Sequence, residues 1–118
     1  MYIRHKTGKK GEDVAAFFLQ GIGYNLVERN FSCRQGEIDI IAKDKNEYVF
    51  IEVKSRRNNK YGEPIDGVNE KKIKCLKKAI NYYLYINKLE NCYIRIDIIE
   101  VKYKKNKIYI NNIKQAVT

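Results

Sequence analysis

Two stretches of the chain carry apolar residues at the spacing of an amphipathic helix. The first extends from about Lys9 to Gln20, where the following glycines predict its end. The second extends from about Asn69 to Lys88, with several lysines away from its apolar face. The apolar stripe consists of Ala15, Ala16 and Leu19 in the first helix, and of Ile73, Leu76, Ile80, Tyr83 and Leu84 in the second.

The rest of the chain alternates in the manner of strands separated by polar turns. Apolar residues occupy both faces of the third strand, which predicts a central strand covered by helices on both sides. A right-handed crossover through the second helix would make the third and fourth strands parallel. The pattern therefore predicts a single α/β domain over residues 1–118 in the order α-β-β-β-α-β-β. The five predicted strands are Tyr24–Phe31, Gly36–Lys43, Glu47–Ser55, Cys92–Tyr103 and a short Lys107–Asn111.

Charge adds a polyanionic partner to this picture. The 118 residues include 24 Lys and Arg against 14 Asp and Glu, a net charge of +10. Such a surplus fits nucleic acid or an acidic membrane surface, and it equally fits a basic surface that only keeps the protein in solution. No apolar run is long enough for a membrane span, and no signal peptide is evident. We therefore expect a cytoplasmic protein that does not enter membranes.

Histidine and cysteine offer little for catalysis. The one histidine, His5, lies in the basic segment 1–8, which we expect to be frayed. Histidine-dependent triads and most zinc sites are therefore disfavoured. The three cysteines are widely spaced and odd in number, which is typical of reduced thiols in a cytosolic protein.

Carboxylates and a lysine on the second and third strands remain as candidates. A turn centred between Lys45 and Asn46 would place Asp39 opposite Glu52. Lys54 lies two residues beyond Glu52 and shares its face. Two facing carboxylates repel one another unless a cation lies between them, and Mg²⁺ or Mn²⁺ suits such ligands. A bound cation would activate water, and the lysine would orient that water or stabilise charge on phosphorus.

Other assignments of these residues stay open. The Glu-x-Lys pattern recurs at Glu70 and Glu100, but only Glu52 has a strand acid as a partner on the neighbouring hairpin arm. Asp39 and Glu52 could also form simple ion pairs with Arg34 or Lys54. Glu12, by contrast, continues the core-facing stripe of the first helix, where it could cap the first turn or approach the same site.

Several blocks of the sequence resemble the YraN family of small bacterial proteins, over about Gly8 to Ala116. That family is regarded as a divergent PD-(D/E)xK nuclease, similar to archaeal Holliday-junction resolvases. The resemblance implies a restriction-endonuclease-like, three-layer fold with a mixed five-stranded sheet. It also implies Asp39, Glu52 and Lys54 as catalytic residues, with Glu12 joining Asp39 and Glu52 at the metal. The blocks are Gly11–Ala15, Arg29–Phe31, Gly36–Ala42, Phe50–Arg56 and Arg95–Asp97. The "PD" dipeptide itself is absent, since Ile38 precedes Asp39, and the chain has no tryptophan.

A basic loop follows Lys54 directly and would extend from the edge of the proposed site. Arg56, Arg57 and Lys60 are candidates for phosphate contacts, and Tyr61 is a candidate for stacking on an unpaired base. Arg95 and Asp97, which share a face of the fourth strand, are instead expected to form a structural pair.

These expectations lead to a metal-dependent endonuclease acting on DNA, with branched or flapped DNA as candidate substrates. A nucleic-acid binding module on the same scaffold that does not cleave is the alternative. A third possibility is an adaptor for a protein partner in a DNA-processing assembly. A homodimer is also expected, because symmetric cutting of two strands requires two sites.

Overall fold

The architecture comes from a computed structural model, which describes residues 2–56 and 70–117, with side chains in the first range from Lys10 onward. Two helices and five strands follow one another in the predicted order. They are α1 (Tyr2–Gly21), β1 (Asn25–Cys33), β2 (Gly36–Asp44), β3 (Glu47–Arg56), α2 (Glu70–Ile86), β4 (Tyr93–Lys104) and β5 (Lys107–Val117).

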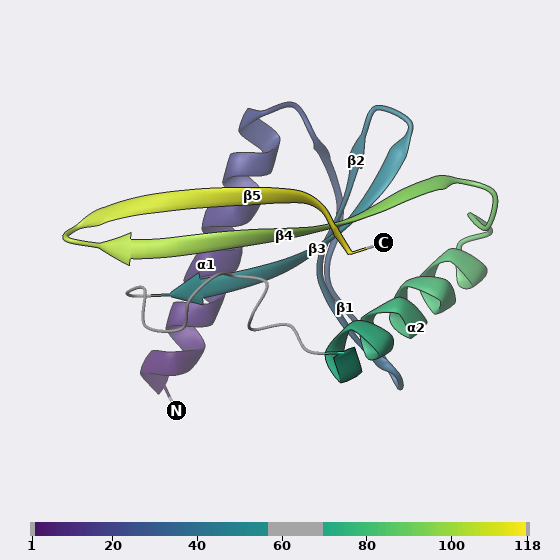
Figure 1. The fold of residues 1–118 in the computed structure, drawn as a ribbon, viewed down its shortest axis with the longest axis horizontal. Coiled ribbons are helices and arrows are strands. Elements are labelled where there is room, and N and C mark those ends of the chain that lie inside the picture. Colours follow the sequence, from purple (N-terminus) through teal and green to yellow (C-terminus); the bar gives the residue numbers. More distant parts are fainter. Residues whose placement is uncertain (1, 57–69, 118) are drawn as a thin grey trace.

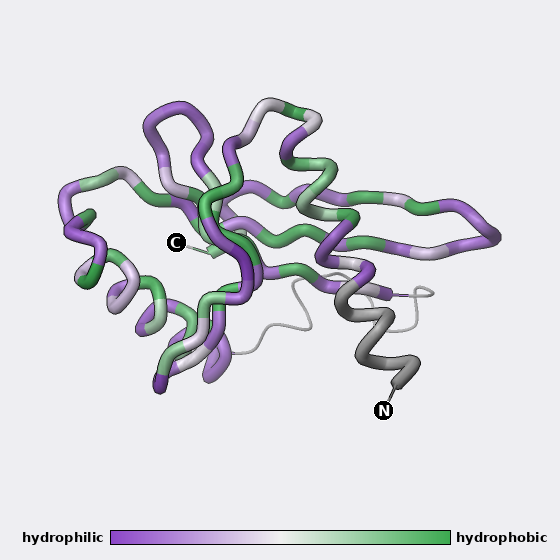
Figure 2. The backbone as a smooth tube through the Cα atoms, turned by 180° about the vertical axis from the view of Figure 1, so that it is seen from behind, coloured by the Kyte–Doolittle hydropathy of each residue, from purple (hydrophilic) through white to green (hydrophobic). Residues whose placement is uncertain are grey.

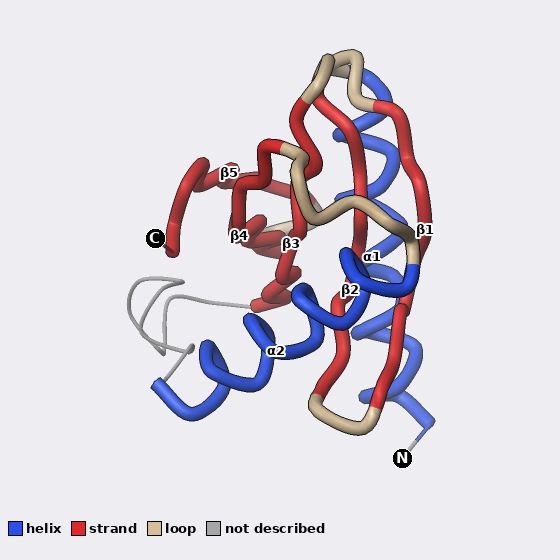
Figure 3. The backbone as a smooth tube through the Cα atoms, turned by 90° about the vertical axis from the view of Figure 1, so that its right-hand side faces the viewer, coloured by secondary structure: helices blue, strands red, loops and turns tan. Residues whose placement is uncertain are grey.

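The five strands form one sheet whose spatial order matches their order in the chain, β1-β2-β3-β4-β5 (Figure 1). Strands β3 and β4 are parallel, and each other pair of neighbours is antiparallel. Helices α1 and α2 lie on opposite sides of this sheet (Figure 3). The mixed sheet and the parallel crossover through α2 are confirmed.

Each face of the sheet has its own apolar core. On one face, Ala15 and Leu19 of α1 pack in a cluster with Ile40 and Ile51. On the other, Leu76, Ala79, Ile80 and Tyr83 of α2 pack with Phe50, whose ring meets that of Tyr83 edge-on at 5.8 Å. Hydrophobic colouring is prominent along the inner strands, and the long β4–β5 hairpin is hydrophilic at its tip (Figure 2).

Two elements are longer than the sequence suggests. Helix α1 begins at Tyr2 rather than near Lys9, so the backbone of residues 2–8 continues the helix where a frayed segment was expected. A close approach explains Gly11 within it, because a Cβ there would collide with the side chain of Ser55. Strand β5 continues to Val117 instead of ending at Asn111. Its polar second half pairs with β4, which compensates for weak alternation.

Arg95 of β4 is the centre of a buried polar cluster, named here the Arg95 network. Its five N–H donors meet Asp97 twice, at 2.9 and 3.1 Å, then Tyr24, Glu47 and Asp44 at 2.6, 3.0 and 3.4 Å. The predicted pairing of Arg95 with Asp97 is confirmed.

Strand β5 is bent where it meets this network. Gln115 has φ = 49°, and its backbone N–H donates to Asp97 Oδ1 at 2.9 Å. The pairing of β4 with β5 shifts register between Ile96 and Ile98, close to that contact.

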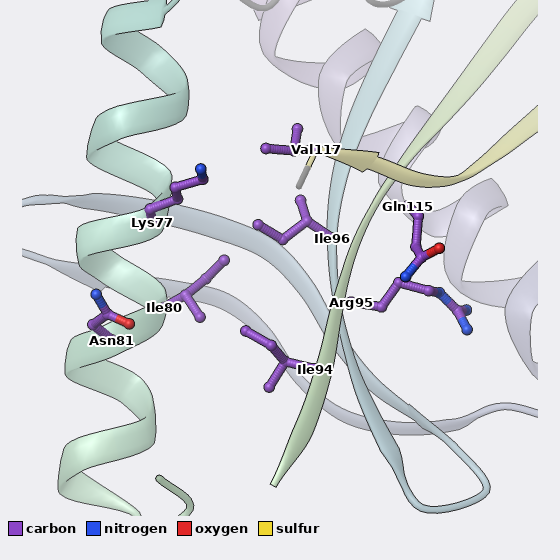
Figure 4. A pocket seen from close by; sticks show the side chains of 8 residues that line it. All are labelled: Lys77, Ile80, Asn81, Ile94, Arg95, Ile96, Gln115 and Val117. Atoms are coloured by element: carbon purple, nitrogen blue, oxygen red, sulfur yellow. The ribbon is translucent and has the colours of Figure 1, made fainter. Parts of the chain in front are cut away.

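A cavity of about 360 Å³ lies between α2 and the neighbouring part of β4. Ile80, Ile94, Ile96 and Val117 line it, and the guanidinium of Arg95 points away from α2 (Figure 4). Among the described residues, no helix is both long and apolar enough to cross a membrane.

Candidate active site

The second and third strands bring Asp39 and Glu52 together in the predicted register. Ile40 pairs with Ile51, and one further step along the hairpin sets Asp39 opposite Glu52. The regular backbone pairing of β2 with β3 ends at Ile40 and Ile51. Beyond that point, the side chain of Asp39 joins the strands, because its Oδ2 accepts a hydrogen bond from the backbone N–H of Val53 at 2.8 Å. This side-chain contact fixes the carboxylate at the point where regular pairing of the strands stops.

The surroundings make Asp39 hard to ionise. Burial and, after it, the charge of Glu52 raise the pKa of Asp39 to about 7, against the opposing effect of the Val53 N–H. The more distant charges of Glu12 and Glu37 also favour the protonated form. Two neighbouring acids therefore share a region that does not fully compensate both charges.

Two lysines partly compensate Glu52, whose side chain is only 8% exposed. Lys54 Nζ lies 3.5 Å from Glu52 Oε2, and Lys72 Nζ of α2 lies 2.6 Å from the same oxygen. Burial lowers the pKa of Lys54, and its contact with Lys72 lowers it further. Burial also acts to lower the pKa of Lys72, but its contacts with Glu52 and Lys54 outweigh this and raise it. We call Asp39, Glu52, Lys54 and Lys72 the carboxylate–lysine site.

An open cavity of about 470 Å³ gives access to this site. Asp39 and Glu52 line it together with Lys71 and Lys72 from the first turn of α2. Gly36 permits the close approach of β2 to that helix, since a Cβ there would lie 3.1 Å from the backbone oxygen of Cys75. Gly36 thus has a steric role at the entrance of β2.

Glu12 is near the site but engaged elsewhere. Its charge acts on Asp39, yet its carboxylate forms an ion pair with Arg29 at 3.2 Å. Arg29 also contacts Asp13 at 2.7 Å. Across residues 2–56 and 70–117, no three side chains among His, Cys, Asp and Glu gather closely enough to hold a metal ion. A role for Glu12 as a third ligand stays a prediction.

Most of the candidate nucleic-acid contacts belong to the segment 57–69, which the structure does not describe. Arg57, Lys60 and Tyr61 lie outside the described residues. Arg56 is described, and its side chain is only 7% exposed, with Nε 3.2 Å from Glu100 Oε2. Its guanidinium therefore faces a buried acid rather than the surface where a phosphate contact was expected.

Lys72 and Glu100 were missed by the sequence reasoning, which considered each only as half of a Glu-x-Lys motif. A signal existed for Lys72, because it lies four residues before Leu76 and so extends the buried stripe of α2 by one turn. Glu100 lies beside Lys54 in the parallel ladder and is fully buried. That neighbour depends on the β3–β4 register, which no local pattern specifies.

Comparison with known proteins places the chain in a family. A model described as "Uncharacterised protein family UPF0102" matches residues 11–101. A UPF0102 protein of Caldicellulosiruptor saccharolyticus is 41% identical over 115 residues, which cover 96% of this chain and 98% of the relative. A UPF0102 protein of Clostridium kluyveri is 48% identical over 94 residues, 80% of this chain and 77% of the relative.

Among solved structures, a protein described as SSO0001 matches 94% of this chain and 51% of its own length. The sequence identity is 18%, and the TM-score of 0.35 is too low to support an argument. The family model and the relatives, in contrast, agree over most of the chain and confirm the resemblance to YraN. The chain belongs to the UPF0102 (YraN) family.

Proposed function

We propose that this protein is a metal-dependent endonuclease-like hydrolase that acts on DNA, with branched or flapped DNA among its substrates. The observation that carries the proposal is the setting of Glu52. This nearly buried carboxylate faces Asp39 on the next strand and contacts two lysine ammonium groups beside an open cavity. Titratable groups shifted by burial and by one another in a cleft are typical of catalytic sites.

The donor set suits a hard divalent cation. Asp39 and Glu52 supply oxygen ligands, and burial and the charge of Glu52 raise the pKa of Asp39, a carboxyl whose ionised form a cation would stabilise. Mg²⁺ or Mn²⁺ held there would polarise a water molecule and offset negative charge on the phosphate.

The chain's own residues would then divide the work of hydrolysis. Asp39 and Glu52 would hold the cation, and the Val53 N–H fixes the orientation of Asp39. Lys54, whose side chain is 20% exposed, is positioned to hydrogen-bond the attacking water or an oxygen of the phosphate. The water would lose a proton to solvent as its oxygen forms a bond to phosphorus, the bond from phosphorus to the leaving sugar oxygen would break, and that oxygen would take up a proton from solvent.

The basic surface supports a polyanionic substrate. Exposed lysines continue along α2 from the opening of the cavity, and the whole chain carries a charge of +10. Contacts of lysine with phosphate hold a duplex without selecting its sequence. The exposed lysines of α2 are Lys71, Lys72, Lys74, Lys77 and Lys78.

The test is a cleavage assay with purified protein on duplex, single-stranded, flap and four-way DNA, with Mg²⁺ or Mn²⁺. We expect products that require the metal and are lost in Asp39→Asn and Lys54→Ala while both variants keep their circular dichroism spectrum. Because an oxyanion-stabilising donor contributes about 10²–10³-fold in rate, Lys54→Ala should lose activity on that order. Equal activity in the wild type and both variants would indicate a contaminating nuclease and contradict the proposal.

One observation favours a second candidate, a nucleic-acid binding module that does not cleave. The described part of the chain gathers only two carboxylates at the site, with a lysine already on Glu52. This candidate predicts binding without any metal-dependent product. Its affinity for duplex DNA would fall with salt: a plot of the logarithm of the association constant against the logarithm of the salt concentration would have a slope of about −0.9 for each phosphate contact.

A further inference from the structure

Lys72 makes the shortest contact with Glu52, although it comes from a different element than the Glu-x-Lys pair. Its Nζ lies 2.6 Å from Glu52 Oε2, against 3.5 Å for Lys54. The stem of Lys72 follows the buried stripe of α2, but its side chain remains 46% exposed. Lys72 therefore combines a tight contact to a buried acid with access to the open cavity.

The position of Lys72 is otherwise unfavourable for a cation. It lies in the first turn of α2, where the partial positive charge of a helix N-terminus disfavours ammonium groups. Its neighbours there include Lys71, and Lys54 is close enough to interact with it. The acids Glu52 and Asp39 are the attractive charges that offset this repulsion.

A divalent cation would change the formal charge of the carboxylate–lysine site. With both acids ionised, Asp39 and Glu52 equal Lys54 and Lys72 in number, so a bound divalent cation would leave a surplus of two positive charges. A phosphodiester in the cavity would reduce that surplus. Of the two lysines, Lys54 is the less exposed, at 20%, and extends from a central strand, whereas Lys72 is 46% exposed at the cavity.

We propose that Lys72 is a second active-site lysine, which neutralises Glu52 until a divalent cation takes that carboxylate and then contacts the substrate phosphate. This inference rests on the proposed function for the identity of the phosphate. It adds a residue of α2 to the site, and it predicts that the lysine and the metal compete for one oxygen.

The first measurement is Mn²⁺ binding without DNA, followed by the electron paramagnetic resonance signal of free Mn²⁺. The variants are Lys72→Met and, as a matched control, Lys74→Met, which removes the same charge from an exposed position of α2 outside the cavity lining. We expect Lys72→Met to bind Mn²⁺ about tenfold more tightly than Lys74→Met, because a competing ammonium at contact distance is gone. Equal affinity, weaker affinity, or no Mn²⁺ binding by any form would overturn the inference.

The second measurement is the affinity of labelled duplex and four-way DNA with Ca²⁺ and with EDTA. With Ca²⁺ the loss in Lys72→Met should exceed that in Lys74→Met several-fold, because Lys72 is then available to phosphate. With EDTA the two variants should lose similar affinity. A difference between the variants that does not depend on Ca²⁺ would overturn the proposal that Lys72 moves from Glu52 to phosphate when a cation binds. Circular dichroism of each variant, and of a Lys72→Gln variant, controls for folding.

These results separate the two proposals. Wild-type cleavage with no distinction between Lys72→Met and Lys74→Met would leave the nuclease function and remove the role of Lys72. The expected metal and DNA results without cleavage of any substrate would keep that role on a site that binds but does not cut.

Discussion

The Arg95 network and the carboxylate–lysine site are both groups of charged residues centred on strands of the same sheet, but only in the first does the chain supply a partner for every donor of the central group. Each of the five N–H donors of Arg95 has an oxygen partner within 3.4 Å. Burial alone would lower the pKa of Arg95, but its contacts with Asp97 and Tyr24 raise it, so the charged form is favoured. In the carboxylate–lysine site, two lysines contact one oxygen of Glu52, while Asp39 retains a raised pKa.

The difference separates a structural cluster from a functional one. A buried group whose hydrogen bonds are all made by the chain needs nothing further and holds its strands in place. A group whose pKa is shifted because the chain does not fully compensate its charge is stabilised in the ionised form when a ligand of opposite charge binds. Three experiments, taken from the largest expected effect to the smallest, test this contrast.

Removal of the guanidinium should cost the most stability. Arg95→Met would leave Asp97, whose side chain is 1% exposed, as a buried charge without its main partner. We expect the free energy of unfolding to fall by about 3–5 kcal/mol, which urea denaturation would measure. Arg34→Met, at an exposed position, is the control and should change it by less than about 0.5 kcal/mol. A loss below about 1 kcal/mol in Arg95→Met would show that the network is not structural.

Asp39→Asn should have the opposite effect at neutral pH. Because the pKa of Asp39 is about 7 in the native protein and ordinarily 3.8, the native carboxyl between these pH values holds a proton that the unfolded chain has released. Its contribution to stability is therefore complete below about pH 4 and is lost as the pH rises to 7. Between pH 5 and 8, the stability of Asp39→Asn relative to wild type should rise by about 2 kcal/mol. Parallel pH profiles of the two proteins would contradict this account.

Addition of a divalent cation should give the smallest change in stability, and the change should depend on the carboxylate–lysine site and not on the Arg95 network. Ca²⁺ at about ten times its dissociation constant should stabilise the wild type by about 1.4 kcal/mol at pH 8. At pH 6, below the pKa of Asp39, protons compete and the thermal shift should be clearly smaller. Asp39→Asn should lose most of the shift, while Arg95→Met should keep it wherever that variant is folded. A shift independent of pH and of Asp39 would place the cation elsewhere.

The predictable part of this molecule is the part that local patterns specify. Alternation and the polar turn at residues 44–47 gave the β2–β3 register, and with it the meeting of Asp39 and Glu52. Apolar stripes gave both helices and their two cores. The polar second half of β5 was missed because its pairing with β4 overrides a weak strand pattern.

The other omissions arise from contacts between distant segments. Arg56 appeared to belong to an exposed basic loop, but the parallel ladder brings it beside the fully buried Glu100. Lys72 belongs to the Glu-x-Lys pattern that begins at Glu70, but residues two apart on a helix do not face one another, so this pattern does not point to a site. The relevant partner of Lys72 is instead Glu52, on a strand, and only the packing of α2 across the sheet brings them together.

The bend of β5 at Gln115 also affects how molecules of this protein meet one another. Strand β5 is an edge of the sheet, and a long straight edge can recruit a strand from another copy and start aggregation. At Gln115 the backbone N–H turns inward to Asp97, so an incoming strand finds the regular row of donors and acceptors interrupted. The contact that completes the Arg95 network thus also makes this edge a poor template for intermolecular pairing.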